Sequence, residues 1–294
     1  MQEDFIISGR LRDLGGFSVH RSLPSPQKRQ LGPFVFLDHM GPVKVDKVHA
    51  MDVRPHPHIG LATVTYLFDG KAFHRDSLGS KQEITPGDLN WMTAGKGIVH
   101  SERTPPVERS GKLNHFMHGV QIWVGLPKEH EECDPHFVHW PKTQLPDVKI
   151  SENLNGKLLI GEFANQISPV KVLMKTLFLD IQVKNRTRET LSFMEKELGL
   201  FLISGQAIIN GHEMQTDDLI VVSNPLKIQV ELSEGARLIA IGGDPFPEPR
   251  YIWWNFVSTR KERIHQAARD WKNQSMGQVV DETEFIPLPD IPMP

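Results

Sequence analysis

The sequence predicts an all-β protein built from two tandem β-barrels, with one short helix near the C-terminus. Short β-type runs alternate with turn residues roughly every 8–12 positions along most of the chain, which is typical of β-sandwiches and barrels. A pair of hairpin signals in the first half recurs in the second half. The length of 294 residues fits two domains of about 150 residues each.

The strand runs are bounded by clear turn signals. In the first half, residues 62–68 precede the turn Asp69-Gly70, and residues 121–124 precede a Gly-Leu-Pro turn. Asn210-Gly211 lies between two β-type runs and is a strong hairpin signal. Further runs in the second half cover 171–183, 200–204, 207–210, 219–223, 227–232 and 238–242.

A weak internal repeat indicates duplication of one barrel. Residues 68–72 followed by 84–89 parallel residues 204–207 followed by 214–219. The segment 127–155, rich in Pro, His, Lys and acidic residues, is interpreted as a linker between the two copies. We therefore expect an N-terminal domain over 1–135 and a C-terminal domain over 136–294.

One helix is expected after residue 258. Thr259 and Glu262 have the spacing of a capping box. An apolar face follows at helical spacing, formed by Ile264, Ala267, Ala268 and Trp271.

Composition excludes several function classes. The net charge of −3 and the pI near 6.5 give no electrostatic reason to expect binding to nucleic acid or to an anionic membrane. Cys133 is the lone cysteine, which excludes an internal disulfide and suits a reducing compartment. No run of 18 apolar residues and no signal-peptide pattern is present, so the expected location is cytoplasmic. A monomer is the default expectation for the oligomeric state.

Two short motifs carry metal-binding chemistry. His56 and His58 flank Pro57 just before a predicted strand, and His100 and Glu102 flank Ser101 after a glycine-rich turn. Residues i and i+2 of an extended chain project from the same face. Two such pairs on neighbouring strands would supply three nitrogens and one carboxylate oxygen. This donor set suits iron, manganese, cobalt, nickel, copper or zinc rather than calcium or magnesium.

The alternative is that these histidines are ordinary hydrogen-bonded side chains, because the chain contains 14 histidines. The second pair at a suitable distance, with a Pro-Gly-Asp turn at 86–88 between the two pairs, favours a metal site. His39 is expected to hydrogen-bond within the fold. His115 and His118 are interpreted as strand-edge residues, with a position near a pocket mouth as the alternative. The linker histidines are assigned no chemistry: His130, His136 and His139.

At this point the chain resembles the pirin family of the cupin superfamily. The resemblance extends almost from end to end. It rests on FLDHMGP at 36–42, HPHIG at 56–60, TVTY at 63–66, TPGD at 85–88, AGKGIVHSE at 94–102, GVQIWVGLP at 119–127, WWNFVS at 253–258 and EFIPLP at 284–289.

The resemblance implies two cupin (double-stranded β-helix) barrels, a bicupin, with one divalent metal ion in the first barrel. The family's ligands match His56, His58, His100 and Glu102, and the ion implied is Fe2+, with Mn, Ni, Co, Cu or Zn as alternatives. Many cupins carry a glutamate where this chain has Ala62. That departure puts the usual activity in doubt, because the pocket would lose an acidic group beside the metal.

The activity implied is that of a quercetin 2,3-dioxygenase, which cleaves flavonols such as quercetin with dioxygen. Glu102 would act as the catalytic base for the flavonol hydroxyl. A second hypothesis is an iron-binding, redox-responsive regulatory protein that acts through protein partners. Metal-assisted isomerisation or hydrolysis of another small molecule is a third, because a cupin fold does not fix the reaction.

Overall fold

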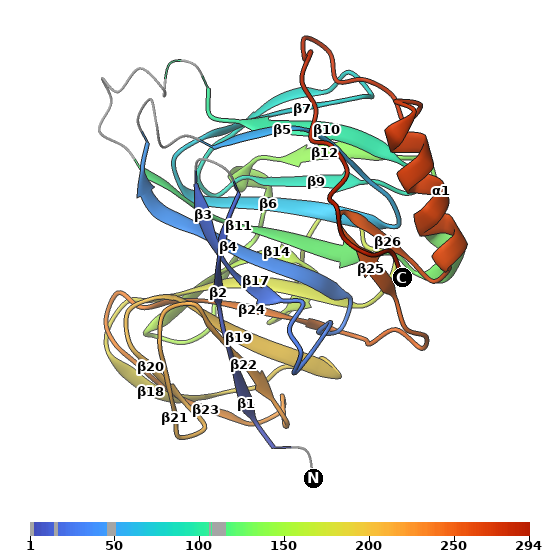
Figure 1. Cartoon of the computed structure of the whole chain (residues 1–294). Coiled ribbons are helices and arrows are strands. Elements are labelled where there is room, and N and C mark those ends of the chain that lie inside the picture. Colours follow the sequence, from blue (N-terminus) through green and yellow to red (C-terminus); the bar gives the residue numbers. More distant parts are fainter. Residues whose placement is uncertain (1–2, 15–16, 46–50, 106, 108–115) are drawn as a thin grey trace. The chain divides into compact units, whose positions relative to one another are not determined.

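A computed structural model describes residues 3–14, 17–45, 51–105, 107 and 116–294 (Figure 1). The chain forms two compact units, each made of several chain segments. Unit 1 comprises Met1–Leu11, His20–His39 and Pro141–Phe246, and unit 2 comprises Arg12–Val19, Met40–Trp140 and Pro247–Pro294.

These units differ from the continuous domains 1–135 and 136–294 that the sequence suggested. The N-terminal strand β1 (Phe5–Ser8) pairs with β22 (Asp218–Val222), so the start of the chain belongs to unit 1. The C-terminal helix α1 (Lys261–Lys272) packs with Ile59 and Val99 of unit 2. Backbone pairing and apolar burial, rather than chain order, decide the composition of each unit.

The predicted linker at 127–155 does contain the passage from unit 2 to unit 1, between Trp140 and Pro141, but it also contributes strands to both units. Its middle portion forms strand β12 (His136–Trp140), which pairs with β9 (Leu89–Thr93) in unit 2. Its end forms β13 (Asp147–Lys149), which pairs with β14 (Leu154–Ile160) in unit 1. Two short 3-10 turns lie at Lys128–His130 and Lys142–Gln144.

Unit 2 is organised around two antiparallel sheets. The four-stranded sheet has the order β5-β10-β7-β8, formed by Asp52–His58, Ile98–Arg103, Ala72–Asp76 and Lys81–Ile84. The seven-stranded sheet has the order β12-β9-β6-β11-β4-β3-β2, with the unit boundaries falling inside its last three strands. The strands not yet given are β6 (Leu61–Asp69), β11 (Phe116–Gly125), β4 (Phe34–Lys44), β3 (Ser18–Leu23) and β2 (Arg10–Asp13).

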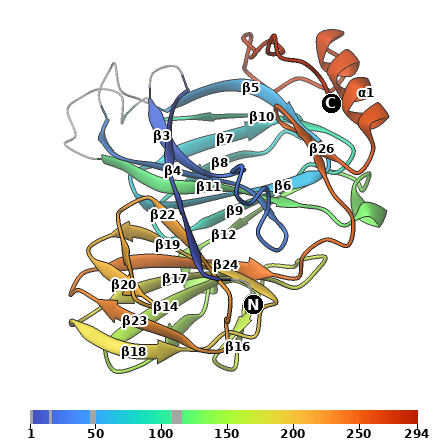
Figure 2. The same cartoon turned by 60° about the horizontal axis from the view of Figure 1, so that its bottom comes forward.

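Unit 1 repeats the same plan, and three strands of its four-stranded sheet, β18, β20 and β23, are labelled in Figure 2. That sheet has the order β18-β23-β20-β21, formed by Thr187–Leu191, Ile228–Leu232, Ala207–Ile209 and His212–Met214. The seven-stranded sheet has the order β1-β22-β19-β24-β17-β14-β13, in which β19 is Glu197–Ser204, β24 is Arg237–Gly243 and β17 is Thr176–Val183. A small hairpin joins β15 (Glu162–Phe163) to β16 (Gln166–Ile167).

The helix α1 forms with the predicted apolar face, beside the hairpin of β25 (Tyr251–Trp253) and β26 (Phe256–Ser258) (Figure 1). Ile264, Ala267, Ala268 and Trp271 are all buried, as the spacing indicated. The predicted capping box is wrong. The helix N-cap is Arg260, and the Thr259 hydroxyl donates to a carboxylate oxygen of the buried Glu131 (3.0 Å).

The prediction of an all-β fold with one short C-terminal helix is confirmed. Among the helices of the described residues, none is long and apolar enough to cross a membrane. The core of unit 1 is a continuous apolar cluster that draws on both of its sheets, from Leu158 and Leu179 to Val230. Unit 2, by contrast, places a group of polar side chains at its four-stranded sheet.

Candidate metal centre

Strand β10 lies between β5 and β7 and therefore has a neighbour on each side (Figure 2). His100 on β10 pairs directly with His56 on β5. Pro55 and Pro57 restrict the residues before them to extended conformations, which keeps β5 in strand geometry up to His58. The sequence pairs at 56–58 and 100–102 are thus brought side by side, as the i and i+2 spacing predicted.

The three histidines form one compact group. The ring centroids of His56 and His100 are 4.3 Å apart, and each is 5.0 Å from that of His58. All three side chains are buried. One ring nitrogen from each lies within 4.8 Å of the others, a distance at which they could share one ion.

Backbone carbonyls orient two of these rings. The Nδ1–H of His56 donates to the Arg54 carbonyl (2.8 Å), and the Nδ1–H of His58 donates to the Asn255 carbonyl (3.2 Å). Each bond leaves Nε2 with the lone pair, the arrangement found in metal-ligating histidines.

The residues present fit a metal ion. Nε2 of His58 and both ring nitrogens of His100 are buried without a hydrogen-bond partner among the described residues, and buried polar atoms are rarely left so. Burial lowers the pKa of His56 to about 4 and the pKa values of His58 and His100 well below 6.5. The imidazoles are therefore neutral at pH 7, which is the form that binds a metal.

Glu102 is buried at the same sheet but does not join the three-histidine group. Its Oε1 accepts a hydrogen bond from the Thr65 hydroxyl (2.8 Å). Burial raises the pKa of its carboxyl, although nearby His74 and the bond from Thr65 oppose that rise. The carboxylate instead forms a second group with His74 and His100, in which one donor atom from each lies within 4.8 Å of the others.

His74 is a residue that the sequence analysis missed. It lies on β7 directly opposite Glu102 on β10, while Asp76 lies opposite His100. The signal was present as a third alternating pair, His74-x-Asp76, in a strand after the Asp69-Gly70 turn. The spacing of this pair is the same as that of the two motifs selected, but the pairing of β7 with β10 cannot be read from the sequence.

The concern about Ala62 is removed by the strand geometry. Thr65 reaches Glu102, so the residues of β6 that alternate with Thr65 share its face, and Ala62 lies on the opposite one. On the neighbouring strand, Trp123 packs against His58 and pairs with Thr63 rather than with Ala62. A carboxylate at position 62 would point away from the histidines.

The other histidines singled out in the sequence lie outside both donor groups where they are described. His39 hydrogen-bonds Asp217 through Nδ1 (2.5 Å), as expected. His118 packs edge-on against Phe68, and His115 lies outside the described residues. His139, expected in a linker, lies in β12, where its Nδ1 hydrogen-bonds the Asn90 side chain (2.7 Å).

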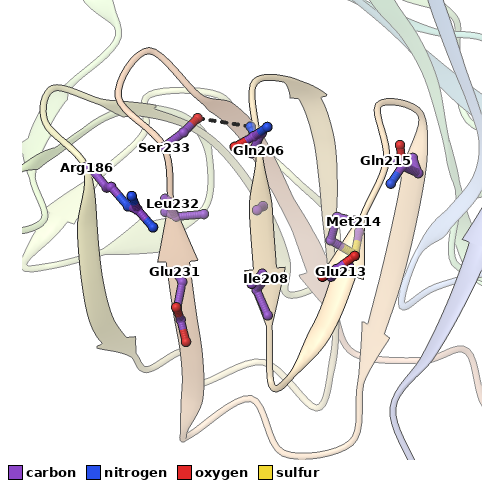
Figure 3. Close-up of a pocket in the computed structure, with 10 residues that line it drawn as sticks. Arg186, Gln206, Ile208, Glu213, Met214, Gln215, Glu231, Leu232 and Ser233 are labelled. Carbon is purple, nitrogen blue, oxygen red and sulfur yellow. Dashed lines mark hydrogen bonds between the residues drawn. The ribbon is translucent and has the colours of Figure 1, made fainter.

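A separate cavity of about 310 Å³ lies in unit 1, at the four-stranded sheet (Figure 3). Its lining includes Arg186, Glu213 and Glu231 but no histidine, cysteine or aspartate. Across the described part of the chain, groups of His, Cys, Asp or Glu that could hold an ion occur only in unit 2. The cavity is therefore not the candidate metal centre.

Comparison with known proteins gives the family. The Pirin family model matches residues 16–124, and the model of the pirin C-terminal cupin domain matches residues 178–277. A pirin-like protein of Caulobacter vibrioides is 40% identical over 98% of this chain and 99% of its own length. Human pirin is 28% identical over 89% of each chain.

Among solved structures, a quercetin 2,3-dioxygenase from Acinetobacter baumannii superimposes with a TM-score of 0.92. It is 36% identical, and the match covers 99% of this chain and 96% of that one. The two family models, the similarity to these proteins and the repeated barrel plan agree, and the chain belongs to the pirin family, whose C-terminal domain is a cupin.

Proposed function

We propose that this protein is a metal-dependent dioxygenase of the quercetin 2,3-dioxygenase type that acts on flavonols. One divalent ion, Fe2+ in this proposal, would be held by His56, His58, His100 and Glu102. The observation that carries the proposal is the buried group of neutral imidazoles, in which Nε2 of His58 and both ring nitrogens of His100 lack partners among the described residues. The 36% identity to a solved quercetin 2,3-dioxygenase supports the choice of reaction.

A bound divalent ion would supply open coordination positions and would lower the pKa of a coordinated flavonol hydroxyl. Glu102 would take up the proton of that hydroxyl. Burial raises the pKa of its carboxyl, which moves it toward the range in which a general base works near neutral pH. The hydrogen bond from Thr65 to Oε1 holds the carboxylate in place.

Aromatic side chains beside the histidines suit a planar substrate. Trp123 lies edge-on to His58 with ring centroids 5.0 Å apart, and Phe137 stacks on His74 at 4.2 Å. Aromatic pairs of this kind are favourable by about 1 kcal/mol beyond their burial. They would orient the rings of a flavonol and exclude water from the reacting bonds.

The test is oxygen uptake by the Fe2+-loaded protein after anaerobic loading, with quercetin as substrate. We expect uptake that requires quercetin, that is lost in His100→Ala and that persists in His139→Ala, a control histidine outside both donor groups. Equal uptake in wild type and His100→Ala would contradict the proposal. Metal binding without any oxygen uptake would favour the regulatory hypothesis, in which the iron site acts through a protein partner.

A further inference from the structure

The C-terminal segment, residues 276–291, lies along the four-stranded sheet that carries the histidines and is drawn in red in Figure 1. It contacts β5 at Pro55, β10 at Ser101 and Arg103, and β8 at Lys81. The segment and these strands all belong to unit 2. The strands that bear both metal-binding motifs are thus contacted by a part of the chain that is distant from them in sequence.

Glu282 is the centre of these contacts. Its carboxylate accepts two hydrogen bonds from Arg103, from Nε to Oε1 (2.8 Å) and from Nη2 to Oε2 (2.7 Å). Oε1 also accepts from the Ser101 hydroxyl (3.0 Å) and lies 3.5 Å from Nη1 of Arg75 on β7. The side chain is 7% exposed. A two-pronged bond of this kind fixes the orientation of both partners.

The charge of Glu282 is needed where it lies. Arg103 and Arg75 belong to adjacent strands and both approach the same carboxylate, which compensates two positive charges. Burial would raise the pKa of Glu282, but the hydrogen bonds from Arg103 and Ser101 and the charges of the two arginines hold it below its usual value. The group is therefore ionised at pH 7.

Glu282 binds β10 from the face opposite to the metal donors. Ser101 lies between His100 and Glu102, and successive residues of a strand project to opposite faces. Ser101 also pairs directly with Arg75 of β7. One carboxylate therefore holds β10 and β7 together immediately behind the candidate ligands.

Strand β5 has a β-bulge at the same place. His56 pairs with His100. The next pair along the two strands is Val53 with Glu102, so residues 54 and 55 of β5 lie opposite a single residue of β10. A bulge bends its strand and changes the direction of the side chains beside it. The direction of the His56 ring therefore depends on how this bulge is held.

The C-terminal segment holds the bulge through the backbone. The Pro55 carbonyl accepts the N–H of Ile286 (2.8 Å), next to the Arg54 carbonyl that orients the His56 ring. Ile286 is itself fixed to the helix α1, because its carbonyl accepts Nε1–H of the buried Trp271 (2.9 Å). The bulge is thus tied to the apolar cluster around α1.

We propose that the C-terminal segment is a positioning element of the metal centre, in which Glu282 and the Ile286 N–H hold β10, β7 and the β5 bulge from the face opposite to the metal donors. The inference rests on the proposed metal centre and deepens it. Glu282 acts on the ligands through Ser101 and Arg103. Because a site must hold its ligands to within about 0.5 Å, metal affinity should depend on these contacts.

The test is titration of the metal-free full-length protein with Co2+, whose visible absorption spectrum reports the coordination geometry as well as the affinity. Glu282→Gln keeps the size of the side chain but loses the charge that compensates Arg75 and Arg103. We expect Co2+ affinity to fall by about 10-fold and the visible bands to change. Glu282→Asp, which keeps the charge, should recover part of the affinity.

Asp281→Asn is the matched control. Asp281 precedes Glu282 in the segment, and its carboxylate pairs with Lys81 of β8 at the exposed surface (2.6 Å). The substitution removes one ion pair from the same segment, so the Co2+ affinity and spectrum should be those of wild type. Urea unfolding of each metal-free variant measures stability separately.

Ile286→Pro tests the contact with the bulge. The substitution removes the N–H that binds the Pro55 carbonyl, while the carbonyl that accepts from Trp271 remains. We expect Co2+ affinity to fall by about 10-fold. Ile286→Ala keeps the N–H and controls for the lost side chain, and its affinity should change much less.

Two outcomes would overturn the inference. One is Co2+ binding by folded Glu282→Gln with the affinity and spectrum of wild type. The other is an equal loss of affinity in Glu282→Gln and Asp281→Asn, which would indicate a general loosening of the segment.

The proposed function can fail separately. If wild type binds no Co2+, the proposed metal centre fails and this inference fails with it. If Co2+ binding depends on Glu282 but the Fe2+-loaded protein takes up no oxygen with quercetin, the proposed reaction fails and the positioning role of the segment stands.

Discussion

Strands β10 and β23 occupy the same place in the two four-stranded sheets, yet their core-facing residues are opposite in character. The orders β5-β10-β7-β8 and β18-β23-β20-β21 correspond strand by strand. On β10, His100 pairs with His56, whereas on β23 Ile228 pairs with Leu191. The same fold therefore supports a polar interior that could hold a metal ion in one unit and an apolar core in the other.

The two interiors contribute differently to the stability of the fold. Ile228, Val230 and Leu232 are buried in the continuous apolar cluster of unit 1, where each fully buried side chain contributes roughly 2 kcal/mol. At the equivalent sheet of unit 2 this stabilisation is smaller, because burying imidazoles and a carboxylate without partners costs free energy. A bound ion would supply the missing partners.

The largest effect is expected from copying the polar pair into unit 1. Ile228→His with Val230→Glu repeats the spacing of His100 and Glu102. We expect the free energy of unfolding to fall by about 5 kcal/mol, because two apolar groups are lost and two polar groups are buried unpaired. Circular dichroism during urea unfolding measures the change.

Metal analysis of the same variant completes the test. No second ion is expected, because Leu191 lies opposite position 228 where β5 supplies His56. A second bound equivalent, or unchanged stability, would show that the interiors of the two units are interchangeable.

Low pH should destabilise the metal-free protein, because it favours protonation of His56, which is buried in unit 2. The pKa of His56 is lowered by burial from 6.5 to about 4, so between these values the unfolded state binds a proton that the folded state does not. The stability is fully present above pH 6.5 and is lost as the pH falls toward 4, by roughly 3 kcal/mol for this group.

Tryptophan fluorescence reports this loss selectively. The six tryptophans and both tyrosines of the chain lie within the residue ranges of unit 2. We expect the fluorescence-detected stability of His56→Asn to be less sensitive to pH in this window than that of wild type. Equal slopes in the two proteins would contradict the assignment to His56.

Metal removal is expected to have a somewhat smaller effect. A ligand that binds only the folded state at 100 times its dissociation constant stabilises that state by about 2.7 kcal/mol. Chelation should therefore lower the thermal midpoint seen by tryptophan fluorescence. His100→Ala, which removes the residue shared by both donor groups, should show no response to the chelator; a response equal to that of wild type would place the ion elsewhere.

The smallest effect is expected at Ala62. Because this side chain lies on the face of β6 opposite Thr65, Ala62→Ser should leave metal affinity unchanged and should lower stability by about 1 kcal/mol. Thr65→Val is the contrasting variant on the inward face and should weaken metal binding by about 10-fold. Calorimetric titration of both variants distinguishes the two faces.

The sequence predicts most of what is local in the fold and the site. The alternation in the β-type runs, the repeated hairpin signals and the apolar face of α1 depend on neighbouring residues, so the all-β class and the helix could be read directly. The pairs at 56–58 and 100–102 were selected by the same local spacing. The family resemblance added the expectation that both barrels are cupins and that the first holds one metal ion.

What the sequence could not supply depends on pairing between distant strands. His74 belongs to the site because β7 pairs with β10 in a register that places it opposite Glu102. Thr259 does not cap α1 because Glu131, distant in sequence, accepts its hydroxyl. Segment 127–155 has a linker-like composition, yet β12 completes a sheet through backbone hydrogen bonds that are independent of composition.

The proposal that the histidines around His100 hold a metal ion is tested most directly by metal analysis. The protein is purified and loaded anaerobically with Fe2+, and its metal content is compared between wild type and His100→Ala. We expect one ion per chain in wild type and none in the variant, since both donor groups contain His100. One ion per chain in both proteins would contradict the assignment of the metal centre to this group of histidines.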